Sequence, residues 1–252
     1  MELAVSMGWL ESVALAGVRM TAFVFIAPPF SYNAFPARIK AMLAAGLALA
    51  VAPRVSPGYV QHDFGGFVLA LILEVAVGAA LGFLVYLVFA AVQSAGGLID
   101  MFGGFQMAQG FDPQSMINGA QFARLFHITA IALLFASGGY QLIIGGLARS
   151  FEALPVGAGI DLTIPAEMMV NGVTQMFLAA VQIAWPLLVV LFLADAGLGL
   201  LTRVAPALNA FALGFPLKIL LTVTLSAVVF VVMPTVVSSL TGEAVGLLTG
   251  VR

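Results

Sequence analysis

The sequence has 252 residues, of which 62% are hydrophobic and only 8% are charged, and its formal net charge is −2 at pH 7. A soluble domain of similar length is about 45–50% apolar and about 25% charged, so the mean hydropathy of +1.15 indicates a membrane protein. The charge balance gives no basic surface of the kind that binds nucleic acid. Because the chain has no cysteine and two histidines, we expect no disulfide, no metal site and no cofactor.

Six hydrophobic segments follow one another along the chain. They span residues 12–30, 41–53, 67–99, 125–147, 168–201 and 207–240. We expect all six to be helices, because only helices and closed barrels satisfy the backbone in lipid and the alternation of barrel strands is absent. The sequence therefore predicts an all-α membrane protein. No linker separates independent parts, so residues 1–252 are expected to form one membrane domain.

The lengths of these segments do not match six simple spans, each of which needs about 20 residues. The second segment offers about 13 residues before Pro53, whereas the third and the fifth offer about 33 and 34. We therefore expect hairpins, broken helices or helices that project beyond the bilayer. Pro186 favours a break in the fifth segment, since its ring frees the carbonyl of Gln182; a tilted helix that tolerates the proline is the alternative.

No arrangement of residues typical of catalysis is visible. The chain has no Gly-x-Ser-x-Gly elbow, no His-Glu-x-x-His zinc motif and no phosphate-binding glycine-rich loop with its lysine. Asp100 and Asp195 lack the local motifs of an intramembrane aspartyl protease. We therefore expect no catalytic residue and no enzymatic activity.

Glu74 lies inside the third segment, and Gly78 and Gly82 follow it on nearly the same helical face. Such a strip of small residues lets another backbone approach closely, which would place Glu74 at a helix–helix interface. Its side chain is then either a relay for protons or ions or, as we favour, part of a structural ion pair or hydrogen bond. Arg19, in the first segment, has either Glu74 or Asp100 as a possible partner.

The segment 103–113 combines glycines with large apolar side chains. Phe105, Met107 and Phe111 offer bulky and partly pliable apolar surface, and the glycines among them allow tight backbone approach. Asp112, followed by a proline, is typical of a turn or a helix start. The residues alone leave two interpretations open: a hydrophobic constriction that occludes a pore, or an interfacial loop that anchors the chain.

Four strongly polar groups lie where the fifth and sixth segments meet: Asp195, Arg203, Asn209 and Lys218. Polar groups are costly inside a membrane and usually have partners there. Arg203 falls at the end of a long helix, where a cation interacts favourably with the helix dipole. Asn209 suits the first turn or the cap of the next helix, and Lys218 can reach proline-freed carbonyls or an acidic partner. A simple turn between helices explains Arg203 well and the other two less well.

Several short motifs are spread over nearly the whole chain. They are Arg19 to Pro29, Pro36 to Lys40, Glu74 with Gly78 and Gly82, Ala95 to Asp100, Gly104 and Phe105, Asp112 and Pro113, Gly138 to Tyr140, Ser150 and Phe151, Leu154 to Gly157, and Gly197 to Lys218. Together they resemble the FliR family of flagellar export-gate proteins and its counterparts in virulence type III secretion. The stretch Gly214 to Lys218 is similar to the flagellar branch.

This resemblance implies a non-enzymatic subunit of the flagellar type III export gate. FliR-like proteins form with FliP and FliQ a closed pore for unfolded flagellar subunits, and FlhA and FlhB join them in the export apparatus. The implied location is the bacterial inner membrane within the flagellar basal body, with a multi-pass or partly periplasmic arrangement. The resemblance also implies a FliP-like part over about residues 1–165 and a FliQ-like helical hairpin over 166–252.

The resemblance further assigns roles to the residues named above. Phe105, Met107 and Phe111 align with the pore plug of the family. The structural or subunit-contact group comprises Arg19, Glu74, Asp100, Asp112, Asp195, Arg203, Asn209 and Lys218. The stretch around Asp195 to Lys218 becomes the bend of a hairpin. The alternative function is an autonomous ion or solute transporter that uses Glu74, Asp195 and Lys218. Membrane lipid is an expected partner in either case, and nucleic acid is not.

Overall fold

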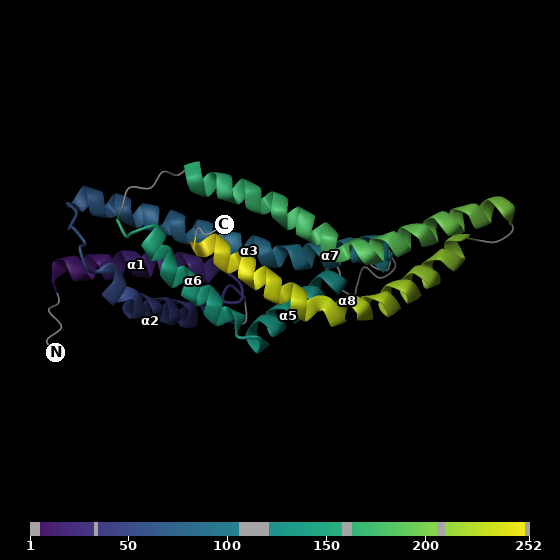
Figure 1. The fold of residues 1–252 in the computed structure, drawn as a ribbon, viewed down its shortest axis with the longest axis horizontal. Helices are drawn as coiled ribbons and strands as arrows, with labels where there is room; N and C mark the ends of the chain where they lie inside the picture. Colours follow the sequence, from purple (N-terminus) through teal and green to yellow (C-terminus); the bar gives the residue numbers. More distant parts are fainter. Residues whose placement is uncertain (1–5, 33–34, 106–120, 158–162, 206–209, 250–252) are drawn as a thin grey trace. The chain divides into compact units, whose positions relative to one another are not determined.

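A computed structural model describes residues 6–32, 35–105, 121–157, 163–205 and 210–249. The described residues form seven helices and no strand, which confirms the all-α prediction (Figure 1). The helices are α1 (Met7–Ile26), α2 (Ala37–Val55), α3 (Phe64–Phe102), α5 (Gln121–Ala136), α6 (Gly139–Ala153), α7 (Thr163–Val204) and α8 (Ala210–Thr249).

Local signals explain where several of these helices begin and end. Ser6 caps α1, because its hydroxyl accepts a hydrogen bond from the backbone N–H of Trp9 at 3.2 Å. Asp63 caps α3 in the same way, because its Oδ1 accepts a hydrogen bond from the backbone N–H of Gly66 at 3.1 Å. α1 ends at Ile26, just before Pro28 and Pro29, which could not continue its hydrogen bonding.

Four helices are long and apolar enough to cross a membrane, or five if one broken pair counts as a span. The four stretches are Met7–Ile26, Phe64–Phe102, Glu167–Val204 and Leu213–Thr249. The broken pair is α5 with α6, separated at Gly138, whose φ of 72° lies in the left-handed region that glycine tolerates. The fourth hydrophobic segment of the sequence is therefore two helices rather than one.

Prolines interrupt the helices less than the sequence analysis expected. α2 runs for 19 residues and continues through Pro53 to Val55, so the short segment of about 13 residues was an underestimate. α7 runs for 42 residues through Pro186, and α8 for 40 residues through Pro216 and Pro234. Of the two interpretations offered for Pro186, the helix that tolerates the proline is the one observed.

The chain divides into two compact units. Unit 1 comprises residues 1–88, 134–173 and 239–252, and unit 2 comprises 89–133 and 174–238. In unit 1, α1 and α2 pack along each other, with Gly17 of α1 facing Ala48 of α2. The fully buried core of this unit includes Leu15, Ala16, Phe23, Ala44, Val85, Ile143 and Leu147.

Unit 2 contains a row of aromatic rings and a helical hairpin. Phe122 contacts Phe105 and Phe126 edge to face, with centroids 5.1 and 6.2 Å apart, and Phe126 contacts Phe230 in the same way at 5.4 Å. The parts of α7 and α8 in this unit run antiparallel: Asp195 pairs with Lys218, and Gly214 lies against Leu198. Both contacts are centred near residue 206, as expected for a hairpin.

Candidate functional site

The most buried polar cluster of unit 1 is built on an ion pair between α1 and α3. Arg19 Nε donates to Glu74 Oε2 at 2.5 Å, and Arg19 Nη2 donates to Glu74 Oε1 at 3.0 Å. The two side chains are 0% and 2% exposed. This two-pronged geometry matches the planar guanidinium to the carboxylate. Of the two acidic partners considered for Arg19, the structure selects Glu74 and not Asp100.

The segment that follows α6 completes this cluster. Arg19 Nη1 donates to the carbonyl of Leu154 at 2.8 Å, and the N–H of Gly157 donates to Glu74 Oε1 at 3.3 Å. The guanidinium carbon of Arg19 also lies 4.2 Å from the ring centroid of Phe151. A buried ion pair is tolerated only when such additional contacts satisfy its remaining donors and acceptors. The pair therefore joins α1, α3 and the end of α6.

Gly78 and Gly82 bring the backbones of α1 and α3 together beside this pair. A Cβ on Gly78 would overlap the carbonyl oxygen of Arg19, and one on Gly82 would lie 3.2 Å from that of Phe23. The predicted small-residue contact strip on α3 is thus confirmed, and its partner is α1. The close approach places Glu74 within reach of Arg19.

In unit 2, Asp100 of α3 caps the start of another helix, α5. It is fully buried near the end of α3, and its two carboxylate oxygens each accept a hydrogen bond at 3.0 Å, from the backbone N–H groups of Phe122 and Ala123. These N–H groups belong to the first turn of a helix, where no carbonyl within the helix is available to them. Gly96 makes the approach possible, since a Cβ there would lie 2.5 Å from the carbonyl oxygen of Phe122.

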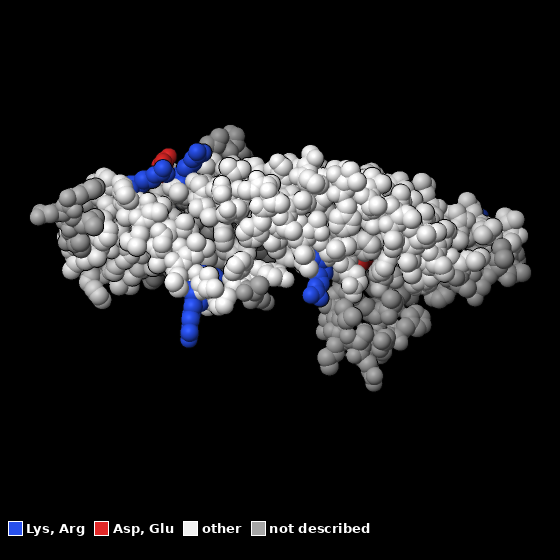
Figure 2. All heavy atoms as spheres, turned by 90° about the horizontal axis from the view of Figure 1, so that it is seen from below, with Lys and Arg blue, Asp and Glu red and all other residues white. Residues whose placement is uncertain are grey.

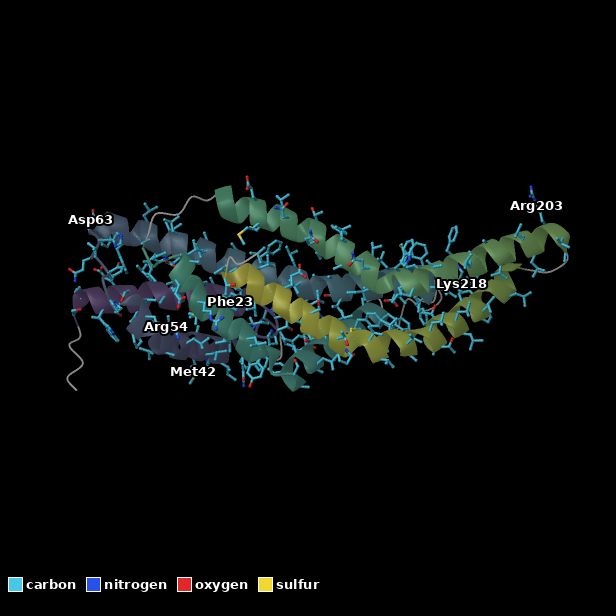
Figure 3. All side chains as sticks on the ribbon, in the orientation of Figure 1. Phe23, Met42, Arg54, Asp63, Arg203 and Lys218 are labelled. Atoms are coloured by element: carbon cyan, nitrogen blue, oxygen red, sulfur yellow. The ribbon has the colours of Figure 1, made fainter. Side chains whose placement is uncertain are left out.

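Two further predicted site residues, Asp195 and Lys218, form an ion pair in the hairpin of α7 and α8. Lys218 Nζ lies 2.6 Å from Asp195 Oδ1, with the lysine side chain 22% and the aspartate 44% exposed. Arg203 is exposed near the end of α7 and points away from the hairpin (Figure 3). Asp195 and Asp100 therefore have different partners, which argues against an aspartyl dyad.

Four of the predicted site residues lie outside the described residues: Met107, Phe111, Asp112 and Asn209. Phe105, the first of the three plug candidates, is described. It is partly exposed, and its ring contacts that of Phe122 at the start of α5. The glycine before it, Gly104, has a φ of 81° and lies against the ring of Phe215.

Sequence reasoning gave no separate role to Lys40, although it is a charged residue with only 8% of its surface exposed. Its Nζ donates to the carbonyl of Ser31 at 2.9 Å and lies 5.6 Å from the ring centroid of Phe25. Helical spacing contained the signal, because Lys40, Ala44 and Ala48 recur every four residues and form the buried face of α2.

A polar cluster between the start of α1 and the segment before α3 was also missed. The hydroxyl of Tyr59 donates to Glu11 Oε2 at 3.4 Å and lies 3.0 Å from His62 Nδ1. Burial, followed by the nearby carboxylate of Glu11, raises the pKa of Tyr59, so its hydroxyl stays protonated at neutral pH. Glu11 lies 48 residues before Tyr59 in the sequence, and no local pattern links it to Tyr59 and His62.

Comparison with known proteins places this chain in a family. A family model described as "Bacterial export proteins, family 1" matches residues 10–244. The flagellar biosynthetic protein FliR of Escherichia coli strain K12 is 33% identical over 223 residues, which cover 88% of this chain and 85% of that protein. FliR of Bacillus subtilis strain 168 is 30% identical over 236 residues, or 89% of each chain. Yop proteins translocation protein T of Yersinia pestis is 32% identical over 179 residues, covering 68% and 67%.

Proposed function

This chain belongs to family 1 of the bacterial export proteins, and from that premise we propose that it is a non-enzymatic subunit of a flagellar type III protein export gate. The observation that carries the proposal is the family match over residues 10–244, which leaves little of the chain unaccounted for. Similarity to both flagellar and Yop translocation proteins supports a role common to the two kinds of export system.

The proposed gate is a closed pore that the chain forms with FliP-like and FliQ-like subunits, and unfolded flagellar proteins pass through it. FlhA-like and FlhB-like proteins are the further partners in the export apparatus, within the inner membrane of the flagellar basal body. The hairpin supports an assembly of this kind, because Trp185 and Phe192 on α7 and Val231 on α8 are 60%, 65% and 80% exposed. Such side chains require lipid or partner helices around them.

We assign structural roles within this gate to the charged groups that are paired or hydrogen-bonded. Arg19 with Glu74, and Asp195 with Lys218, are each paired inside their own unit, and both oxygens of Asp100 are bonded to backbone N–H groups. Groups satisfied in this way hold helices in register and leave subunit contact to the exposed residues, such as Arg203. The division into a FliP-like part and a FliQ-like hairpin belongs to the same proposal.

We assign the pore plug to Phe105, Met107 and Phe111, as a hydrophobic constriction in the closed gate. Contacts at the two ends of this segment support the assignment. On the α3 side, Phe105 touches Phe122 and Asp100 binds the N–H groups of Phe122 and Ala123, which lie on the α5 side of the segment. The helices on either side of the segment are thus joined next to each other, which would hold a plug between them in place.

The competing function is an autonomous transporter that uses Glu74, Asp195 and Lys218. Its support is the presence of charged residues within apolar helices, where they often mark ion pathways. Each of these three groups, however, already has a partner of opposite charge at hydrogen-bond distance. The gate proposal accounts for that pairing, because it needs rigid contacts and no free titrating group.

Co-purification separates the two functions. The tagged full-length chain is expressed from its native locus, extracted in mild detergent and captured, with the untagged strain as the control. We expect FliP-like and FliQ-like proteins to elute with it in fixed proportions. A solitary, monodisperse protein that moves ions or small solutes across liposomes would overturn the gate proposal and favour the transporter.

A further inference from the structure

The region from residue 12 to residue 62 contains four basic residues and no aspartate or glutamate. Two of the four have acidic partners elsewhere in unit 1: Arg19 pairs with Glu74, and Arg54 lies 3.9 Å from Glu152. Within the described parts of the chain, Arg38 and Lys40 form no ion pair. Both lie in the first turn of α2, so an excess of positive charge is left at this point of the unit.

Lys40 carries one of these two charges on the buried face of α2. Its ammonium donates one hydrogen bond, to the carbonyl of Ser31, and lies above the ring of Phe25. An ammonium group has three donors, and its charge is not neutralised by a carbonyl or a ring. Arg38, two residues earlier, is exposed and carries the second charge. An anion placed beside Arg38 would neutralise the exposed charge directly.

Three aromatic side chains lie near the start of α2, where these two basic residues are. Phe25, at the end of α1, is 43% exposed, and Tyr32 and Phe35, between α1 and α2, are 42% and 38% exposed. Aromatic residues in this position are typical of the level of lipid headgroups. Trp9 and Tyr59 lie at the opposite end of α1, which has 20 residues and is therefore about 30 Å long. That length matches the hydrocarbon thickness of a bilayer.

The outward side of α2 is apolar next to these charges. Ile39 and Met42 are 51% and 75% exposed, and Figure 3 shows Met42 pointing away from the helix. Charged side chains are sparse on the face drawn in Figure 2, where most of the surface is uncharged. A basic group beside exposed apolar side chains suits a phospholipid, since its phosphate and its acyl chains meet both features at once.

We propose that Phe25, Tyr32, Phe35, Arg38 and Lys40 form a binding site for the headgroup of an anionic phospholipid. In this site, named the basic corner, Arg38 binds the headgroup phosphate, Lys40 adds a second positive charge, and the aromatic rings lie at headgroup depth. The basic corner sets the depth of unit 1 in the bilayer. This proposal depends on the contacts within unit 1 and does not depend on the proposed export function.

The site is tested with the full-length chain in nanodiscs that contain equal amounts of phosphatidylglycerol and phosphatidylcholine. Native mass spectrometry then measures the ratio of the two lipids that stay bound to the released protein. We expect the chain to retain phosphatidylglycerol preferentially. Arg38→Gln should lower the ratio of bound phosphatidylglycerol to phosphatidylcholine roughly fivefold. Lys40→Gln, added to it, should lower that ratio again by a similar factor. Arg203→Gln, which removes an exposed arginine from the hairpin, should leave the ratio unchanged.

The Arg38 variant decides the result, because its side chain is exposed and its removal does not disturb the Lys40 contact with Ser31. An unchanged lipid ratio for Arg38→Gln would overturn the proposal. Displacement of phosphatidylglycerol by inorganic phosphate at the same concentration would also overturn it, in favour of a free-anion site. If Arg38→Gln instead removes a co-purifying protein and leaves lipid retention intact, the occupant is an acidic protein segment and the lipid site is wrong.

Discussion

Arg19 is a fully buried cation, and its charge makes strict demands on the residues around it. Glu74 neutralises it, Leu154 and Phe151 take its remaining contacts, and the N–H of Gly157 donates a further hydrogen bond to Glu74 Oε1. A pair of this kind adds little net stability over an apolar pair of the same volume, but the loss of one partner is expensive. Its value to the protein is that it specifies which helices meet.

Glu74→Gln should therefore destabilise unit 1 strongly. The amide can still accept a hydrogen bond, but it leaves Arg19 charged and buried without a counter-ion, at a cost of about 3–5 kcal/mol. The measurement is the thermal unfolding midpoint of the purified chain in detergent, together with the yield of assembled complex. The double variant Arg19→Met with Glu74→Leu is the control and should recover much of the loss. If Glu74→Gln assembles normally and abolishes export, proton coupling at Glu74 is favoured instead.

Helix contacts in this chain depend on a few glycines whose positions are matched to a neighbouring backbone. On α3, Gly78 and Gly82 face α1, while Gly96 faces the start of α5. Gly97, the next residue, has no atom of the described residues it could contact within 4 Å of the position its Cβ would take. The helix thus offers a pair of adjacent glycines of which one is needed for packing and the other is not.

Substitution of these adjacent glycines should have opposite effects. Gly96→Ala places a methyl group 2.5 Å from the carbonyl oxygen of Phe122, so α3 and α5 must separate, at a cost of about 1–3 kcal/mol. Gly97→Ala introduces no contact and should stabilise the helix by up to about 1 kcal/mol. Thermal unfolding midpoints of the two variants provide the comparison. Equal destabilisation by both would mean that the close approach at Gly96 does not hold.

The ion pair between Asp195 and Lys218 offers a test of the hairpin. Asp195→Lys places two cations opposite each other and should lower the unfolding midpoint, whereas the exchange Asp195→Lys with Lys218→Asp should restore it. Because both side chains are partly exposed, the pair itself contributes only about 0.2–1 kcal/mol. Failure of the exchanged pair to rescue the single variant would indicate that another neighbour of Asp195 matters more.

At the level of the whole molecule, the proposed function requires an assembly in which this chain contributes one part of a closed pore. Deletion of residues 105–111 should make the assembled gate leak, since the proposed hydrophobic constriction is removed. The measurement is uptake of a small fluorescent solute in cells that carry the complete complex. The control is Gly97→Ala, a substitution that should leave the helix packing intact. Unchanged permeability in a complex of normal composition would exclude the plug assignment.

Much of the fold could be predicted from sequence because it depends on local properties. Apolar length and the absence of alternation predicted helices, and the spacing of Gly78 and Gly82 predicted a contact face on α3. Helix ends were less predictable: α2 continues beyond Pro53, and the fourth segment breaks at Gly138. These outcomes depend on whether packing compensates a lost hydrogen bond, which neighbouring residues alone do not determine.

The sequence by itself determined the membrane class, the helical fold and the family, because each follows from composition or from short motifs along the chain. Only the tertiary structure decided which charges meet. It paired Arg19 with Glu74, bound Asp100 to the first turn of α5, and buried Lys40 with no carboxylate partner among the residues that the structure describes. The physical reason is that helical periodicity is a local property, whereas the partner of a buried charge is chosen by segments that meet only when the chain has folded.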